Sequence, residues 1–409
     1  MGADRLVYIR TDGNANIAAG HLVRCLSIAQ NCLKLNMPVC FLLSDNESKD
    51  LLESFFTEDL KQDKRLSVQV LATAEYDDLE KELPEVSALL TEATTSEGCS
   101  SEGCSSIYLL DSYFVTERYI TEIRSVAKTV YIDDLQLFDY PVDLVINYDV
   151  IPGTAMPAYC DAYRKAGKAL LGATYTPLRS QFENRAITVK ETVSDILITT
   201  GGSDPYHFCV EFIKQYADKF PAGSERSSKT DTTAYTALSS AGSLSAQMPI
   251  ENAQELPTLH VVIGHLSPDR EALYTLSKEY SFIKLYENII DMADLMSKCD
   301  LAVSAAGTTL YELCALGVPA ISFTMADNQL TAAKAFDAVG AIPCSGDIRT
   351  EKEDMFLRIF EFLSKMSSTS SPSEEISEGY ENRLQAYKIV RKLVDGCGAK
   401  YIATEIAGL

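Results

Sequence analysis

Short apolar runs alternate with amphipathic segments from the first residues onward. Leu22 and Cys25 lie at the spacing of one helix face, and this pattern predicts a helix over residues 20–35. Strands that alternate with helices indicate βαβ units and a parallel sheet. The apolar runs that predict the strands of this first series are 6–10, 38–43, 67–71, 107–111, 129–132 and 144–147.

The pattern restarts after about residue 190. An apolar strand over 194–200 ends in a Gly-Gly pair and is followed by a helical segment over 206–216. Two successive series predict an α/β protein of two doubly wound domains, with ligands at the carboxyl ends of the strands and therefore in a cleft between the domains. Further strands are predicted over 259–263, 283–285, 301–304 and 320–323.

The length of 409 residues suits two domains. We expect an N-terminal α/β domain over 1–185 and a C-terminal α/β domain over 186–366. A polar linker and a C-terminal helix would follow over 367–409, with the helix at about 380–394.

Three segments interrupt the pattern of strands and helices. The pentapeptide SEGCS occurs twice in succession within 91–106, and residues 221–256 are rich in Ser, Thr, Ala and Gly. The third is the polar stretch 367–377. Such compositions predict mobile surface loops, and we expect no function of them.

Composition and charge narrow the possible partners. Apolar residues make up 46% of the chain and charged residues 23%, which is the balance of a folded globular protein. The net charge of −22 repels nucleic acid and anionic lipid, although helix N-termini and a few arginines can still hold a small anion. No apolar run reaches about 18 residues, and the first ten residues resemble no export signal. We therefore expect a cytoplasmic protein that binds neither nucleic acid nor, stably, a membrane.

Cofactor signatures are missing from the sequence. Its eleven cysteines form no C-x-x-C pair and its four histidines are not clustered, so we expect reduced thiols and no metal site. Neither G-x-x-x-x-G-K-[ST] nor a complete G-x-G-x-x-G occurs, and ATP hydrolysis and dinucleotide redox chemistry therefore lack their usual motifs. No cofactor is predicted.

The first strand-to-helix junction carries the candidate for catalysis. Gly20 would allow a tight turn, and His21 opens the following helix at the carboxyl edge of the sheet. The helix dipole disfavours a cation there, so a neutral imidazole could act as a general base on water. A helix-capping histidine is the alternative. Arg10 and Arg24 could either pair with Asp12 or hold a substrate.

A stretch of small residues at a second junction predicts an anion site. It follows the strand 301–304 and opens a helix, where free backbone N–H groups meet the positive end of the helix dipole. A diphosphate would fit, and Glu312 could accept hydrogen bonds from both hydroxyls of a ribose. Simple helix capping is the alternative. The stretch comprises Ser304, Ala305, Ala306, Gly307, Thr308 and Thr309.

Other polar groups follow predicted strands and remain open between ligand binding and local structure. Asp111 and the pair Asp133-Asp134 could flank a sugar pocket or form Asx turns. The remaining candidates are Tyr113, the turn Gly201-Gly202-Ser203, and Asn328 with Gln329, which follow the strand 320–323.

Several of these motifs together resemble a known family. The segments RTDGNANIAAGHLVRCLSIA, DSY, IDD, LGATYTPLRSQF, GGSDP and DLAVSAAGTTLYELCALGVPAISFTMADNQ occur in the order found in the UDP-sugar hydrolases of the pseudaminic-acid pathway. Those enzymes remove UDP from UDP-2,4-diacetamido-2,4,6-trideoxy-β-L-altropyranose. The family is related to the glycosyltransferase-B enzymes and to spore-coat polysaccharide biosynthesis proteins. The resemblance spans most of residues 5–345.

The resemblance implies a glycosyltransferase-B fold and attack of water at the anomeric carbon, with C–O cleavage, inversion and no metal. His21 matches the histidine of the family's G-H-x-x-R motif, thought to activate or position that water. The first domain would then hold the sugar and the second the UDP. Arg10, Asp12 and Gly20 match the strand and loop around that histidine, and we expect Asp12 to act with His21 in catalysis. Asn328 and Gln329 match the family's NQ near the sugar, and the residues matching the UDP side are Gly201, Gly202, Ser304–Thr309 and Glu312.

The chain also departs from the family pattern. Ala18 stands where the family has glycine. Two insertions, at 91–106 and 221–256, and a C-terminal extension make the chain longer than typical members of the family. A glycosyltransferase of the same fold, or a sugar-nucleotide-binding protein without catalysis, would share the nucleotide half. The sequence therefore leaves both as alternatives to a hydrolase.

Overall fold

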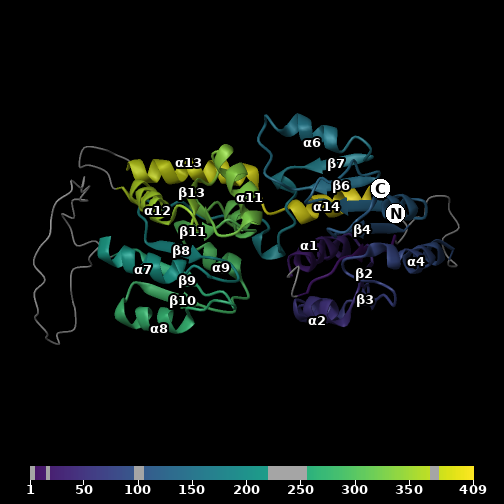
Figure 1. The fold of residues 1–409 in the computed structure, drawn as a ribbon, viewed down its shortest axis with the longest axis horizontal. Helices are drawn as coiled ribbons and strands as arrows, with labels where there is room; N and C mark the ends of the chain where they lie inside the picture. Colours follow the sequence, from purple (N-terminus) through teal and green to yellow (C-terminus); the bar gives the residue numbers. More distant parts are fainter. Residues whose placement is uncertain (1–4, 15–18, 96–105, 220–255, 369–376) are drawn as a thin grey trace, which may run out of the picture.

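The computed structural model describes residues 5–14, 19–95, 106–219, 256–368 and 377–409 (Figure 1). The repeat at 96–105, residues 221–255 and most of the polar stretch 367–377 lie outside the described residues, as does Ala18. The predictions made for them are therefore not tested. Figure 1 shows two α/β units side by side, with the early part of the chain in one and most of the later part in the other.

The first unit is built on a parallel sheet of seven strands in the order β3-β2-β1-β4-β5-β6-β7. Its central strands are buried on both faces, as expected of a parallel sheet covered by helices. The strands are β1 Val7–Arg10, β2 Val39–Leu43, β3 Leu66–Val70, β4 Ile107–Leu110, β5 Lys128–Ile132, β6 Leu144–Asn147 and β7 Lys168–Leu171.

Helices cover both faces of this sheet. One face packs against α1 and α14, and the other against α4 and α5. Side-chain caps fix several helix starts: Asp45 accepts a hydrogen bond from the Ser48 amide, and Thr116 accepts one from the Tyr119 amide. The helices are α1 Gly20–Lys34, α2 Asn46–Ser54, α3 Glu58–Gln62, α4 Leu83–Thr95, α5 Glu117–Arg124, α6 Met156–Ala162 and α14 Gly398–Ala407, with single 3₁₀ turns at Leu79–Lys81, Ala173–Tyr175 and Ser180–Phe182.

The second unit repeats the design with six parallel strands in the order β10-β9-β8-β11-β12-β13. Stacked phenylalanines join the sheet to two helices on one face; the rings of Phe208 and Phe323, for example, have centroids 4.1 Å apart. The strands are β8 Asp195–Thr199, β9 Thr258–Val262, β10 Ile283–Tyr286, β11 Leu301–Ala305, β12 Ala320–Thr324 and β13 Cys344–Asp347. The helices are α7 Phe208–Lys219, α8 Arg270–Glu279, α9 Met292–Met296, α10 Thr309–Leu316, α11 Asp327–Ala338, α12 Lys352–Ser367 and α13 Glu378–Leu393.

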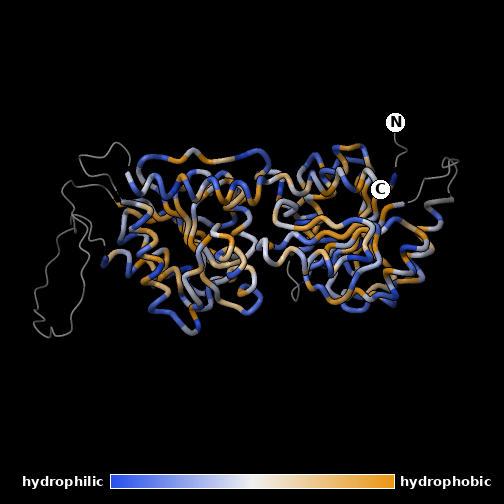
Figure 2. Tube along the Cα trace, turned by 90° about the horizontal axis from the view of Figure 1, so that it is seen from above, coloured by the Kyte–Doolittle hydropathy of each residue, from blue (hydrophilic) through white to orange (hydrophobic). Residues whose placement is uncertain are grey.

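The predicted strands of both series are present within one or two residues of their expected ends. Figure 2 shows the hydrophobic strands in the interior of each unit, with hydrophilic residues outside. Two strands were not predicted. β7 (KALL) and β13 (CSGD) both lie at sheet edges, and the CSGD segment has a single apolar residue.

The C-terminal segment holds two helices where the sequence predicted one. Helix α13 packs on the second unit, and the chain then crosses back so that α14 packs on α1 of the first. Ile402 and Ile406 of α14 are fully buried in that core. The last residues of the chain thus complete the first unit.

The chain passes between the units twice, first between β7 and β8 (residues 172–194, the first crossing) and again from the end of α13 to the start of α14 (residues 394–398, the second crossing). The two crossings lie in direct contact. Arg391 donates hydrogen bonds to the carbonyls of Arg185 and Ala315, and Gly398 lies against the backbone of the first crossing. A Cβ atom at Gly398 would lie 2.2 Å from the carbonyl oxygen of Thr176. The close approach of the two backbones therefore requires glycine there.

Among the described residues, no helix is both long and apolar enough to cross a membrane.

Replacement of Gly398 by alanine should lower the free energy of unfolding by about 1–3 kcal/mol, because the methyl group forces the crossings apart. Chemical denaturation measures the change. Gly408→Ala is the matched control, since its Cβ would approach no atom closer than 3.4 Å. Equal stability of the two variants would show that the crossings do not pack as described.

Candidate active site

In both sheets, candidate residues lie where the strand order reverses. In the first sheet the reversal falls between β1 and β4, and His21 and Asp111 follow those two strands. In the second sheet it falls between β8 and β11. Gly201 follows β8, and the stretch 304–309 runs from the end of β11 to the start of α10. Loops that leave a doubly wound sheet in opposite directions open a crevice, which is the usual ligand position in such folds.

His21 lies in the first turn of α1 with its side chain buried. Its Nδ1 is 2.6 Å from Oδ1 of Asp111. Because an ionised carboxylate can only accept, Nδ1 carries a proton and donates it in this bond. In the neutral form of the imidazole the lone pair is then on Nε2, as a general base requires.

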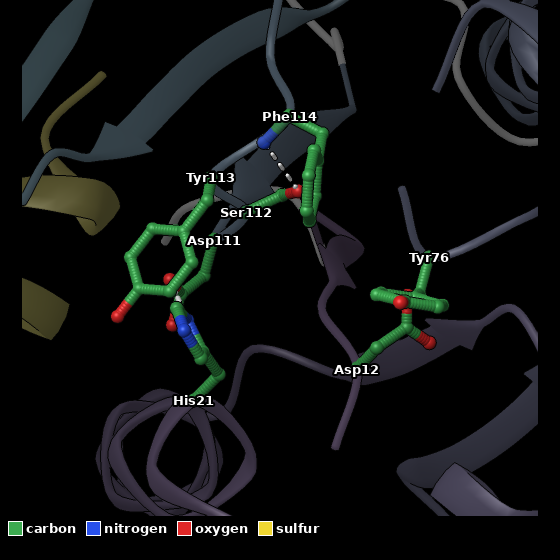
Figure 3. A pocket seen from close by; sticks show the side chains of 7 residues that line it. All are labelled: Asp12, His21, Tyr76, Asp111, Ser112, Tyr113 and Phe114. Atoms are coloured by element: carbon green, nitrogen blue, oxygen red, sulfur yellow. Dashed lines mark hydrogen bonds and ion pairs between the residues drawn. The ribbon is translucent and has the colours of Figure 1, made fainter. Parts of the chain in front are cut away.

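The pocket beside His21 is formed by the first unit. Figure 3 shows His21, Asp111 and Tyr113 together on one side of it, with Asp12 and Tyr76 on the other. The imidazole and the Tyr113 ring meet edge to face, with centroids 4.5 Å apart. The lining residues are Asp12, His21, Tyr76, Asp111, Ser112, Tyr113 and Phe114.

Aromatic rings give this pocket apolar walls. Tyr76 and Phe114 pack edge to face with centroids 5.8 Å apart, and Tyr113 and Phe114 are each 39% exposed. An aromatic face next to carboxylates and an imidazole suits a ligand that has both apolar and hydroxyl-bearing sides, such as a sugar.

Arg24 holds two carboxylates in place around His21. Its Nε donates to Oδ2 of Asp111 at 2.6 Å, its Nη2 donates to Oδ2 of Asp134 at 2.7 Å, and its Nη1 donates to the hydroxyl of Tyr148. Burial by itself would raise the pKa of Asp111, but the charge of Arg24 and the hydrogen bonds from Arg24 and His21 hold this pKa well below its usual value. Asp111 is therefore an anion at neutral pH.

Arg24, Asp111 and Asp134 give the surroundings of His21 a negative net charge. One guanidinium and two carboxylates surround His21, so the side chains around the imidazole carry a net charge of −1.

His21, Asp111 and Asp134 are the one set of side chains in the described residues with the spacing of metal ligands. The guanidinium of Arg24 lies among them, with Nη2 2.9 Å from Nδ1 of His21. Arginine does not deprotonate in proteins, so a metal ion would have to displace it. As arranged, these residues do not fit a metal.

Asp12 lines the pocket, whereas Arg10 lies behind it. Asp12 accepts hydrogen bonds from the amide and hydroxyl of Ser44 at 2.7 and 2.9 Å and a further bond from Arg10. Arg10 is fully buried and pairs with Glu82 at 2.8 Å. Within the residues that the structure describes, Arg10 thus reaches the pocket through its bond to Asp12. Nothing in the sequence around Glu82 distinguishes it from a surface glutamate, and it was not predicted.

Gly20 does not have the role expected from the sequence. It is the first residue of α1, its φ lies outside the left-handed region, and a Cβ there would meet no atom within 4 Å. Neither a turn conformation nor a close contact in the described structure requires glycine at this position.

The glycine turn of the second unit is held by a residue that was not predicted. Gly201 has φ +81°, in the left-handed region that glycine tolerates. Gly264, in the loop after β9, lies so close that a Cβ would be 2.5 Å from the carbonyl oxygens of Gly201 and Gly202. Ser203 follows this turn and is half-buried.

The stretch 304–309 offers fewer donors than the sequence predicted. The buried Ser304 hydroxyl donates to the Ala305 carbonyl, and the Gly307 amide donates to the same oxygen. Ala305 and Ala306 are buried. In the described structure, the amides of Thr308 and Thr309 have no hydrogen-bond acceptor. Both therefore remain available as donors at the start of α10.

Glu312 lies one turn into α10 and already has a partner. Arg179, from the first crossing, donates to its carboxylate at 2.9 Å. Burial raises the pKa of Glu312, and Arg179 opposes this shift. Asn328 is exposed at the start of α11, whereas Gln329 accepts a hydrogen bond from the Met325 amide at 2.8 Å. Arg179 was not predicted, although it lies in the LGATYTPLRSQF segment.

The structure brings His21, Asp12 and Tyr113 into one pocket but places no residue of the second unit in its lining. The two candidate regions are connected by aromatic side chains. The ring of Tyr148, which binds Arg24, meets the ring of Tyr311 in α10 with centroids 6.0 Å apart.

Asp111→Asn should change how stability depends on pH. The pKa of Asp111 is depressed on folding, so its contribution is complete above the unfolded value of about 3.9 and is lost as pH falls toward the folded pKa. The wild type should therefore be more stable than the variant by a few kcal/mol at pH 6, and this gap should narrow toward pH 3. Urea unfolding at a series of pH values measures the gap; a constant gap would contradict the assignment.

No protein-family model matches the chain. The chain is similar to the spore coat polysaccharide biosynthesis protein SpsG of Bacillus subtilis, with 26% identity over 229 residues, which are 56% of this chain and 54% of that protein. A stretch of 53 residues is 40% identical to the pseudaminic acid cytidylyltransferase and UDP-2,4-diacetamido-2,4,6-trideoxy-beta-L-altropyranose hydrolase of Helicobacter pylori, covering 13% of this chain and 10% of that protein. The chain thus spans about half the length of the first curated relatives it matches.

Among solved structures, the chain is similar to MurG of Acinetobacter baumannii, with a TM-score of 0.58, 13% identity, and coverage of 99% of this chain and 100% of that chain. Together with the two doubly wound parallel sheets, this likeness confirms the predicted fold class: the chain has the glycosyltransferase-B fold.

Proposed function

We propose that this protein is an enzyme that hydrolyses a UDP-linked sugar in nonulosonic-acid or surface-polysaccharide biosynthesis. The observation that carries the proposal is the bond between Nδ1 of His21 and Asp111, which leaves Nε2 as a proton acceptor beside an aromatic-walled pocket.

In the proposed reaction, Nε2 of His21 accepts a proton from water. The water oxygen forms a bond to the anomeric carbon while the bond from that carbon to the phosphate oxygen breaks. UDP leaves with the bonding electron pair, and the free sugar has inverted configuration. Asp111 fixes the tautomer of His21 and balances the charge that it gains.

The second unit would hold the nucleotide. The available amides of Thr308 and Thr309, at the positive end of the α10 dipole, suit the negative charge that develops on the diphosphate. The Gly201-Gly202 turn, at the neighbouring strand end, allows close approach of the backbone to a phosphate. Glu312 would accept the ribose hydroxyls if Arg179 gives up part of its contact.

The comparisons support the substrate class rather than the exact sugar. One relative is named for spore coat polysaccharide biosynthesis, and the name of the other includes hydrolysis of a UDP-linked diacetamido-trideoxy sugar. We propose a sugar of that type as substrate, with Asp12 and Tyr113 in the sugar pocket and Asn328 near it.

Incubation with a panel of UDP-sugars and no acceptor tests the reaction. We expect UDP and free sugar in equal amounts, detected by mass spectrometry. UDP release that depends strictly on an added acceptor would instead identify a glycosyltransferase, and tight binding without any turnover would identify a binding protein.

His21→Asn should lower kcat by about 10²–10⁴-fold, because the general base is lost. The matched control is His207→Asn, at an exposed histidine bonded to Asp269, which should keep activity within about twofold. A His21→Asn variant as fast as the wild type would exclude the assigned role.

Glu312→Gln should weaken UDP binding by about tenfold, since a neutral amide accepts less strongly than a carboxylate from the ribose hydroxyls. Isothermal titration calorimetry with UDP measures the effect. Glu279→Gln, at the end of α8, is the control. Unchanged affinity in Glu312→Gln would remove Glu312 from the nucleotide site.

A further inference from the structure

Tyr148 contacts both units of the protein. It follows β6 of the first sheet, its hydroxyl accepts a hydrogen bond from Arg24, and its ring meets that of Tyr311 at an angle of 78°. It is partly buried against a core cluster of each unit. A series of direct contacts therefore leads from α10 to the guanidinium that holds Asp111.

We propose that Tyr148 is a positioning residue that adjusts the Arg24–Asp111–His21 arrangement to the location of α10. This inference rests on the proposed function, in which the start of α10 binds the diphosphate and His21 acts on the sugar. It assigns to Tyr148 the coupling between nucleotide binding in one unit and proton transfer in the other.

Arg24 is suited to transmit such an adjustment. Its Nη1 is shared between the Tyr148 hydroxyl and Oδ1 of Asp134 at 3.1 Å, while the opposite edge of the guanidinium holds Asp111. The guanidinium is planar and rigid, so a displacement of one edge moves the other. Because Asp111 in turn orients His21 through a 2.6 Å bond, a shift of Tyr148 reaches the imidazole through three successive contacts.

Tyr311 is equally suited to sense the second unit. It is 7% exposed, and its ring also packs edge to face against Phe336 of α11 with centroids 5.0 Å apart. It lies three residues after Thr308, within the same helix that offers the free amides. A ligand that draws the start of α10 toward the first unit would therefore carry Tyr311 with it.

Kinetics of two single variants and their double variant test the coupling. Tyr148→Phe removes the bond to Arg24 but keeps the ring, and Tyr311→Leu removes the ring contact but keeps that bond. Each should lower kcat by about tenfold with KM changed by less than about threefold, and the double variant should be no slower than the slower single variant. Effects that multiply in the double variant would overturn the proposal.

A spectroscopic measurement keeps this test separate from the proposed function. The chain has four histidines, so protein labelled with ¹³C at histidine Cε1 gives few signals, and His21→Asn identifies that of His21. Tyr311→Leu should move the His21 signal although the substitution lies in the other unit. An unmoved signal in the folded variant would overturn the role of Tyr148; Tyr311→Met replaces the leucine variant if that one does not fold.

Tyr286→Phe is the matched control. Tyr286 bonds to Nδ1 of His260 at 2.9 Å in the second sheet, so its loss should move the His260 signal, leave the His21 signal in place and keep kcat within about twofold. A His21 signal that moved in this control would show a general disturbance and overturn the specific path. If the wild type releases UDP from no UDP-sugar, the proposed function fails, and the His21 signal still decides the inference about Tyr148.

Discussion

The chemistry of the first unit depends on the guanidinium of Arg24. It lies between Asp111 and Asp134, and its positive charge holds these two carboxylates close together although their like charges repel. Asp111 then fixes the proton on Nδ1 of His21 and leaves Nε2 as the acceptor. The same guanidinium lies among the three side chains that have the spacing of metal ligands, so its positive charge takes the place that a metal ion would have.

The two units share one arrangement of strands, and in each unit the candidate residues lie at the same place in it. Each sheet reverses its strand order once, and the loops on either side of the reversal carry the polar residues. The units differ in what the loops offer: an imidazole, carboxylates and aromatic rings in the first, and backbone amides with a glycine turn in the second. This division of donors and acceptors suits a ligand with a sugar at one end and a diphosphate at the other.

The connection between the units is compact. Gly398 allows the second crossing to lie against the first, and α14 returns to complete the core around α1. Tyr148 and Tyr311 add a contact beside the candidate site. Under the proposal for Tyr148, a displacement of α10 would reach Arg24 through the contact between the Tyr311 and Tyr148 rings.

The sequence by itself determined the strand series, the two doubly wound domains and the position of His21 at a helix start, because alternating apolar runs and helix-start residues are local signals. The resemblance of its motifs to a known family implied the glycosyltransferase-B fold. The sequence did not predict the edge strands β7 and β13 or helix α14, whose positions depend on what they pack against. Only the tertiary structure decided that Arg10 is buried with Glu82, that Arg24 joins Asp111 to Asp134, and that Arg179 holds Glu312. Each of these pairs joins residues at least 70 positions apart, and whether a charged side chain meets a ligand or another side chain is fixed by such long-range neighbours rather than by its own sequence.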